Sequence, residues 1–406
     1  MSATHKKDLR TGKSLWMSLP APRLPVSRQL PRRKLDCVVI GAGISGALAA
    51  DALSAAGLSV AILDRRGPVR GATPASTALL QYEIDTPLSL LARRIGRSRA
   101  ERLWRRSRLA LDALRERARH LRIDADLVNR DSLYLQGDLL DAAGLQREAL
   151  ARRRAGFEVS FLTPAQVRSR FGIAHRAALL GYDNLAANPR RLTTGFLAAA
   201  LARGATLHAP QEVAHVEPGA TVRIHLAGGG QLRAGAVVFA TGYELPRGVP
   251  HRGHRIVSTW VLATHPQRGR LWEGQAFLWE AADPYLYVRV GPGRRIICGG
   301  EDEDFADEAQ RDALLPAKIR TIARKLAQLI PGIDVRAEFA WTGCFGASIT
   351  GTPTIGPIPR MRNCYGVLGY GGNGITFSML AAQVLRAQIC GNGDPDQDLV
   401  SFTRRF

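Results

Sequence analysis

The 406-residue sequence has few cysteines and few lysines, and it lacks a long apolar run. Its five cysteines are widely spread and form no C-x-x-C pair, which argues against a disulfide framework or a zinc site and suits a reducing compartment. No uninterrupted apolar segment is long enough to cross a bilayer, and the basic first residues lead into no apolar signal segment. These absences predict a cytoplasmic protein without a transmembrane segment and without a metal site.

The charge balance is strongly basic, with a formal net charge of +21 that comes almost wholly from arginine. Such a balance can attract nucleic acid, anionic lipid or an acidic substrate. On the expected helical stretch 87–121, however, acidic residues are interspersed among the arginines, and no aromatic residues interleave with them as in a single-strand binding platform. A solvated basic surface is therefore the simpler interpretation, and a nucleic-acid partner is not expected.

One stretch near the beginning of the sequence has the pattern of a nucleotide site. The apolar run 36–40 predicts a buried parallel strand, and GAGISG follows it at 41–46. A helix through position 56 and a second strand at 58–63 come next, and that strand ends in Asp64. Glycines at these positions allow a tight turn, close approach of a pyrophosphate and close helix packing, while Asp64 suits a ribose hydroxyl. The pattern predicts an adenine dinucleotide site but does not distinguish FAD from NAD.

Three later segments point to the same ligand. Small residues at 71–78 let the chain pass close to a bound group, and the apolar strand at 236–239 ends in Ala240-Thr241-Gly242. At 369–374, GYGGNG leads into an apolar helix expected at 375–388. A helix start offers backbone N–H groups and a positive dipole to electron-rich groups. Two such starts, far apart in the sequence, suit an extended ligand with a pyrophosphate at one and a flavin ring at the other.

The alternation of secondary structure predicts an α/β protein with two domains. The strand and helix pattern around the glycine motif indicates a Rossmann-like FAD-binding domain with a central parallel sheet. Between 256 and 298, β runs joined by short turns indicate an α+β substrate domain with an antiparallel sheet. The expected boundaries are an extended basic arm at 1–34, a discontinuous FAD-binding domain at 35–90, 185–250 and 345–406, and a substrate domain at 91–184 and 251–344.

The ordered segments GAGISG, GATPAST, VVFATG, IICGGED and GYGGNGIT resemble the FAD-dependent oxidoreductases of the D-amino-acid oxidase, glycine oxidase and sarcosine oxidase superfamily. The Ser14-Leu15-Trp16 part of the arm resembles its γ-glutamylputrescine oxidase-like branch. The resemblance implies FAD as the cofactor. With the glycine motif, it gives these candidate cofactor-binding residues: Gly41, Gly43, Ile44, Ser45, Gly46, Asp64, Arg65, Ala72, Thr73, Ser76, Thr77, Val213, Ala240, Thr241, Gly242, Gly371, Gly372, Asn373, Gly374, Ile375 and Thr376.

Departures from the family pattern bear on the substrate. Phe345 stands where amino-acid-oxidising relatives carry an arginine for the substrate carboxylate, although Arg289 or Arg295 can replace it. No lysine occurs between Lys34 and Lys318 to activate oxygen over the flavin, so turnover is expected to be faster with a quinone or dye than with oxygen. Gly343 takes the place of the cysteine that binds FAD covalently in some relatives, so we expect non-covalent FAD.

The resemblance implies an enzyme that oxidises a C–N bond of an amine or N-substituted amino compound by hydride transfer to flavin N5. The candidate catalytic and substrate-facing residues are Tyr285, Tyr287, Arg289 and Phe345. The expected substrate is a small amine, and an amine with an acidic group far from the reacting carbon would suit Arg289 or Arg295. Two alternatives remain open: an FAD-dependent dehydrogenase of a hydroxy acid or polyol, and a flavin module of a nucleic-acid-modifying protein.

Overall fold

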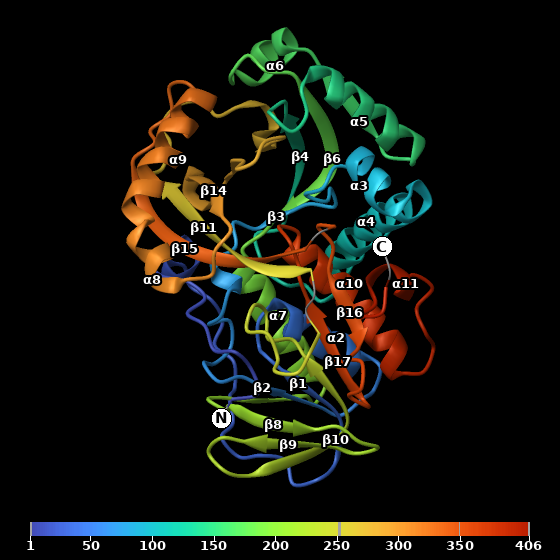
Figure 1. Ribbon diagram of the computed structural model, residues 1–406. Helices are drawn as coiled ribbons and strands as arrows, with labels where there is room; N and C mark the ends of the chain where they lie inside the picture. Colours follow the sequence, from blue (N-terminus) through green and yellow to red (C-terminus); the bar gives the residue numbers. More distant parts are fainter. Residues whose placement is uncertain (1, 251–252, 349, 405–406) are drawn as a thin grey trace.

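The structure is a computed structural model that describes residues 2–250, 253–348 and 350–404. Two sheets dominate the chain and lie at opposite ends of the view in Figure 1, with helices α2 and α7 between them. Each sheet is built from segments far apart in the sequence. The predicted division into a nucleotide-binding half and an antiparallel half is confirmed at this level.

The first sheet has the strand order β16-β17-β10-β1-β2-β7. Its inner neighbours are parallel, and the edge pair β16 and β17 is antiparallel. A β8–β9 hairpin continues from β10. The strands are β1 (Leu35–Ile40), β2 (Val60–Leu63), β7 (Thr206–His208), β8 (Val213–Glu217), β9 (Val222–Leu226), β10 (Gln231–Phe239), β16 (Thr354–Pro357) and β17 (Cys364–Leu368).

Three apolar helices pack together beside this sheet: α2 (Ile44–Ala55), α7 (Pro189–Ala202) and α10 (Gly374–Ile389). Helix α2 lies between the other two and contacts both. It is rich in alanine and buried on nearly every side, which allows this close approach. The packing places the start of α10 near the start of α2, where Ser378 Oγ and Ser45 Oγ are 2.8 Å apart. The two glycine-rich helix starts are therefore neighbours.

The second sheet has the strand order β15-β11-β14-β13-β12-β4-β6-β3, with β5 beside β6. Its pairs are antiparallel except for β12 with β4. The strands are β3 (Leu79–Leu80), β4 (Val128–Leu135), β5 (Val159–Leu162), β6 (Ala178–Ala186), β11 (His254–Thr264), β12 (Phe277–Glu280), β13 (Tyr287–Val290), β14 (Ile296–Glu303) and β15 (Ala337–Ser348).

The remaining helices lie around the second sheet and its border with the first (Figure 1). The expected helical stretch 87–121 is two helices, because Gly96, with φ of 86°, separates them. None of the helices formed by the described residues is long and apolar enough to cross a bilayer. These helices are α3 (Leu88–Ile95), α4 (Arg97–His120), α5 (Ala142–Arg154), α6 (Pro164–Phe171), α8 (Glu308–Ala313), α9 (Leu315–Leu329) and α11 (Gln397–Val400).

Two expected domain boundaries differ from the sheet pairing. β15 pairs with β11 along almost its whole length, so a boundary between 344 and 345 cuts through a continuous strand. β3 lies in the expected nucleotide-binding segment 35–90 but pairs with β6 of the second sheet. The chain leaves the first sheet after β2, at Leu63, and enters the second at Leu79; it leaves the second after β15, at Ser348, and returns to the first at Thr354. Both connections therefore lie inside segments expected for the nucleotide-binding domain.

The N-terminal arm is docked along the body. It contains one short helix, α1 (Leu15–Ser18), in which Leu15 and Trp16 are buried. The Trp16 Nε1–H donates to the carbonyl oxygen of Ser76 at 2.7 Å. An isolated β-bridge joins Gly12 to Trp341. The apolar residues Leu15 and Trp16 at the middle of the arm thus anchor it to the body of the protein.

Candidate functional site

The turn after β1 is held open by glycine. Gly41 has φ of 115°, and a Cβ there would collide with the carbonyl group of Ala240. A Cβ on Gly43 would lie 3.2 Å from Thr73 Oγ1. That hydroxyl accepts a hydrogen bond from the Ile44 N–H at 3.1 Å, so it fixes the helix start from the opposite wall. The turn leaves a narrow space that any side chain at Gly43 would fill.

Asp64 follows the end of β2 and fixes the same turn through hydrogen bonds to backbone N–H groups. Its Oδ2 accepts from the Ala42 N–H at 2.8 Å, and its Oδ1 accepts from the Arg66 and Gly67 N–H groups at 2.8 and 2.9 Å. Burial raises the pKa of the Asp64 carboxyl, and these three N–H groups oppose the rise. The carboxylate is thus preorganised on the wall of a cavity, where its predicted hydrogen bond to a ribose hydroxyl remains an expectation.

Two arginines beyond Asp64 share one acid. Arg65 and Arg66 both form ion pairs with Glu244, whose Oε1 also accepts from the Lys7 N–H at 2.9 Å. Glu244 is buried, and its bonds to the arginines lower its pKa against the effect of burial. This cluster ties the arm, the β2 end and the β10 end together at one end of the cavity.

One elongated cavity runs from this cluster to the glycine-rich segment before α10. It is lined by most of the predicted cofactor residues: Gly41, Gly43, Ile44, Ser45, Asp64, Arg65, Ala72, Thr73, Ser76, Thr77, Val213, Ala240, Thr241, Gly242, Gly371, Gly372, Asn373, Gly374 and Ile375. Gly46 and Thr376 lie behind the wall: a Cβ on Gly46 would strike the Gly41 carbonyl, and Thr376 Oγ1 donates to the Gln81 carbonyl at 2.8 Å. These two residues have a packing role.

The far end of the cavity has aromatic walls. Tyr285 and Tyr287 line it with their ring centroids 5.5 Å apart, and Trp279 lines it beside them. Thr259 Oγ1 and Tyr287 Oη are hydrogen-bonded at 2.8 Å. Burial raises the pKa of both tyrosines well above the ordinary value, so they stay protonated and serve as hydrogen-bond donors or acceptors.

Asp85, an acidic residue that the sequence analysis did not predict for the site, lies at the aromatic end of the cavity. Asp85 lines the cavity, and its Oδ2 accepts from the Gly372 N–H at 2.7 Å. Burial raises the pKa of Asp85, while hydrogen bonds from Gly372 and Tyr285 lower it. The predicted backbone donor Gly372 is therefore already bonded to a side chain here. Asn373 is likewise engaged, because its Nδ2 donates to the carbonyls of Gln81 and Glu83 at 3.1 and 2.8 Å.

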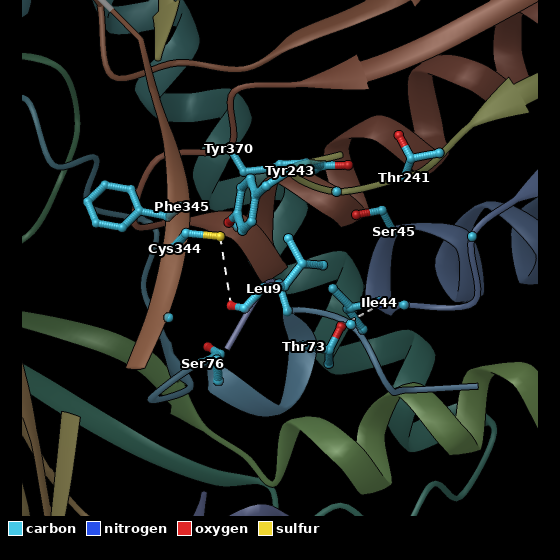
Figure 2. Close-up of a pocket in the computed structure, with 18 of the residues that line it drawn as sticks. Leu9, Ile44, Ser45, Thr73, Ser76, Thr241, Tyr243, Cys344, Phe345 and Tyr370 are labelled. Atoms are coloured by element: carbon cyan, nitrogen blue, oxygen red, sulfur yellow. Dashed lines mark hydrogen bonds between the residues drawn. The ribbon is translucent and has the colours of Figure 1, made fainter. Parts of the chain in front are cut away.

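Cys344 and Phe345 both line the cavity but point to different sides of β15. Figure 2 shows the Cys344 sulfur directed toward Leu9 and the Phe345 ring directed away from it. The Cys344 Sγ lies 3.8 Å from the Leu9 carbonyl oxygen. Burial raises the pKa of the Cys344 thiol to about 12, so it is a protonated and weak nucleophile. Since Gly343 offers no side chain for a bond to the flavin, non-covalent binding fits these residues.

Arg289 does not face the cavity, which corrects its expected role in substrate binding. It is 4% exposed, and its Nη1 donates to the carbonyls of Ala78 and Ala187 at 2.6 and 3.0 Å. The alternative, Arg295, also lies outside the cavity lining and pairs with Glu338 at 2.7 Å. Tyr287 and Arg289 lie on the same face of β13, as residues two apart in a strand do, but Arg289 lies farther along the strand, where it reaches the carbonyls of Ala78 and Ala187. Arg289 therefore joins the β13 strand to the β3 and β6 regions.

Several lining residues carried no recognisable signal in the sequence. Asp85 and Trp279 lie in segments without a motif. Thr259 is one of two threonines in β11, and nothing in the sequence distinguishes it from the other. The N-terminal arm also lines the cavity, at its cluster end through residues 2–4 and farther along through Leu9 (Figure 2). Only the pairing of distant strands and the course of the arm bring these residues to one place.

The glycine turn, the preorganised acid and the long cavity are features of a dinucleotide-binding oxidoreductase. The chain belongs to the FAD dependent oxidoreductase (DAO) family, whose pattern matches residues 36–388. FAD is accordingly its cofactor, and the space above Gly43 that a side chain would fill fits the pyrophosphate.

Relatives share modest identity with the chain. It is 26% identical over 411 residues to the tRNA 5-methylaminomethyl-2-thiouridine biosynthesis bifunctional protein MnmC of Burkholderia thailandensis, covering 92% of this chain and 60% of that protein. It is 24% identical to the probable oxidoreductase OrdL of Rhizobium meliloti, covering 89% of this chain and 85% of that protein. Glycine oxidase from Geobacillus kaustophilus has a similar fold, with a TM-score of 0.72 at 22% identity over 92% of this chain and 99% of that chain. The chain thus spans about three fifths of its MnmC relatives.

Proposed function

We propose that the chain oxidises a C–N bond of an amine or N-substituted amino compound with FAD as the acceptor of the hydride. The observation that carries the proposal is the single cavity that joins the glycine turn at Gly43 to an aromatic end lined by Tyr285 and Tyr287. The membership of the family and the name of the similar glycine oxidase support an amino compound as the substrate.

FAD, when bound, supplies a ring that accepts a hydride and spreads the resulting charge. The residues of the chain bind FAD and the amine and orient them for the transfer. The helix starts of α2 and α10 present N–H groups to the cavity, with Gly374 and Ile375 lining it at the second start. These residues are our candidates for stabilising negative charge as the hydride is transferred.

No strong base is needed in this reaction, because a neutral amine can lose a hydride directly. The tyrosine hydroxyls remain protonated, so they orient the amine rather than remove its proton. Trp279, Tyr285 and Tyr287 provide apolar walls that keep water from the reacting carbon.

For the electron acceptor that reoxidises the flavin, we propose that a quinone or dye accepts electrons faster than oxygen. No lysine side chain lines the cavity in the part of the chain that the structure describes, and Lys318 is paired with Glu303 instead. Equal rates of hydrogen peroxide formation and dye reduction under saturating acceptor would contradict this proposal.

The test of the proposed reaction uses FAD-loaded protein with a panel of primary and secondary amines, hydroxy acids and polyols. Release of ammonia or a primary amine, together with a carbonyl product, is the expected result. Oxidation of hydroxy acids or polyols without any reaction of amines would overturn it and favour the dehydrogenase alternative.

A second candidate is an FAD-dependent module that acts on an amine attached to tRNA. It is favoured by the match to the bifunctional MnmC protein over 92% of this chain and by the net charge of +21. Salt-dependent binding of tRNA, with oxidation of the attached amine, would support it. Absence of binding at low salt would exclude it.

A further inference from the structure

The basic residues that line the cavity lie at one end of it, away from the aromatic end. Among the described residues that line it, the basic side chains are Arg65 and Arg66, and both are paired with Glu244 at the end beside Asp64. At the aromatic end, the charged lining residue is Asp85. A substrate bound beside Tyr285 would therefore meet an acid and no arginine or lysine.

A second carboxyl group, that of Asp302, lies behind the aromatic wall. It lies close enough to Asp85 for the two carboxyls to repel, and it adds to the field around both Tyr285 and Tyr287. Its Oδ1 makes no hydrogen bond among the described residues, while the Thr259 hydroxyl bonds to the carboxyl and lowers its pKa. Asp302 does not line the cavity, so it acts on a ligand through its charge rather than by contact.

Lys318, the basic residue near Asp302, does not neutralise the Asp302 carboxylate. Lys318 is the basic residue that lowers the Asp302 pKa, but its Nζ pairs with Glu303 and donates to the Glu301 carbonyl at 3.0 Å. Burial, with repulsion from Asp85 and Asp283, raises the Asp302 pKa to about 7. The site thus holds more negative potential than its own residues neutralise.

Aromatic faces add a second attraction for a cation. Tyr285 and Tyr287 are tilted by 54° to one another, and Trp279 stacks on Tyr134 with a centroid distance of 3.9 Å. Faces of tyrosine and tryptophan attract ammonium groups, most strongly where water is excluded. Acid and aromatic faces together are the chemistry that recognises a protonated amine.

We infer that the aromatic end binds a cationic group of the substrate, through Asp85 with Tyr285 and Tyr287 and in the electrostatic field of Asp302, so that the substrate is a diamine or polyamine rather than an amino acid. The inference deepens the proposed function and rests on it for the reacting amine. One nitrogen, neutral, lies at the reacting carbon, while a second, protonated, pairs with the acids. A substrate carboxylate at this place would be repelled.

The test compares three ligands of similar length: cadaverine, pentylamine and δ-aminovalerate. Binding to the FAD-loaded protein is measured by calorimetry without oxygen, and turnover is measured separately. Cadaverine is expected to react with a kcat/KM about tenfold or more above that of pentylamine, because pentylamine with its nitrogen at the reacting position leaves the acids without an ammonium group and a hydrogen bond to a charged group is worth about 1.5–3 kcal/mol. The kcat/KM of δ-aminovalerate is expected to be the lowest of the three.

Asp85→Asn and Asp302→Asn are the test variants, and Asp304→Asn is the matched control because Asp304 is exposed, pairs with Arg255 and does not line the cavity. Asparagine keeps an acceptor for Gly372, so folding and flavin content should be retained. The preference for cadaverine should fall about tenfold in either test variant and stay unchanged in the control.

The outcomes separate the inference from the proposed function. Amine oxidation without any preference for cadaverine, or a preference that survives both substitutions, would overturn the inference and leave the function intact. Tight, aspartate-dependent cadaverine binding without flavin reduction by any amine would support the cationic site and overturn the reaction.

Discussion

The Asp85 carboxylate accepts a hydrogen bond from the backbone N–H of Gly372 at 2.7 Å, although 287 residues separate the two in the sequence. Gly372 lies just before α10, and Asp85 lies just before α3. The bond fixes an acid at the helix start where the sequence predicts contact with the flavin. The hydrogen bond between Gly372 and Asp85 therefore joins the part of the cavity predicted to hold the flavin to the part proposed to hold the substrate.

Gly43→Leu should abolish FAD retention without unfolding the protein. The new side chain would fill the space between the glycine turn and Thr73 Oγ1, which lies 3.2 Å from the position of a Cβ. Gly228→Ala is the control, because nothing lies within 4 Å of a Cβ there. Flavin absorbance after desalting is the measurement, and a yellow Gly43→Leu protein would contradict this placement of the pyrophosphate.

Removal of residues 1–8 should weaken FAD binding by about tenfold, because residues 2–4 line the cavity and the Lys7 N–H bonds to Glu244. Val26→Ser serves as the control, since Val26 belongs to the same arm, is 42% exposed and does not line the cavity. The dissociation constant from flavin fluorescence provides the measure. An unchanged constant in the truncated protein would show that the arm is only a surface strap.

Arg289→Met should lower the free energy of unfolding by about 3 kcal/mol, because the carbonyls of Ala78 and Ala187 would lose their charged donor while buried. Arg295→Met, which breaks a partly exposed pair with Glu338, should cost at most about 1 kcal/mol. Urea unfolding of both variants checks the difference. Loss of substrate binding in Arg289→Met at normal stability would restore the substrate role first expected of this residue.

Cadaverine should raise the melting temperature more at about pH 8 than at about pH 6. Burial raises the Asp302 pKa to about 7 in the folded protein. The protonated carboxyl therefore stabilises the folded, ligand-free protein at low pH, and this stabilisation is lost as the pH rises through 7. Above that pH the Asp302 carboxylate is charged and attracts the ammonium group bound beside Asp85. Asp85, Asp283, Lys318 and the two tyrosines also act on this group. A pH-independent shift, or one retained in Asp302→Asn, would contradict this.

Local patterns in the sequence predicted residues for the nucleotide half of the site, and the structure places most of them along one cavity. The run before Gly41, the glycine spacing and the small residues at 71–78 each record a steric requirement, so they can be read without knowing the fold. The strand expected at 36–40 and the helix expected at 375–388 agree closely with β1 and α10. Nineteen of the expected cofactor residues line one cavity for this reason.

The substrate half was harder to predict because its residues meet only through the second sheet. Tyr287 and Arg289 lie on one short strand, but the sequence does not show that Arg289 finds carbonyl partners in the segments near Ala78 and Ala187. Asp85 has no motif around it and gains its role from Gly372. Such partners depend on strand order, which no local pattern records.

The most direct test of the central claim is anaerobic mixing of the FAD-loaded protein with cadaverine while the flavin absorbance is followed. We predict full bleaching of the oxidised flavin, with one equivalent of amino aldehyde and ammonia formed for each flavin reduced. A flavin that stays oxidised with cadaverine and every other amine, but bleaches with a hydroxy acid or polyol, would contradict it.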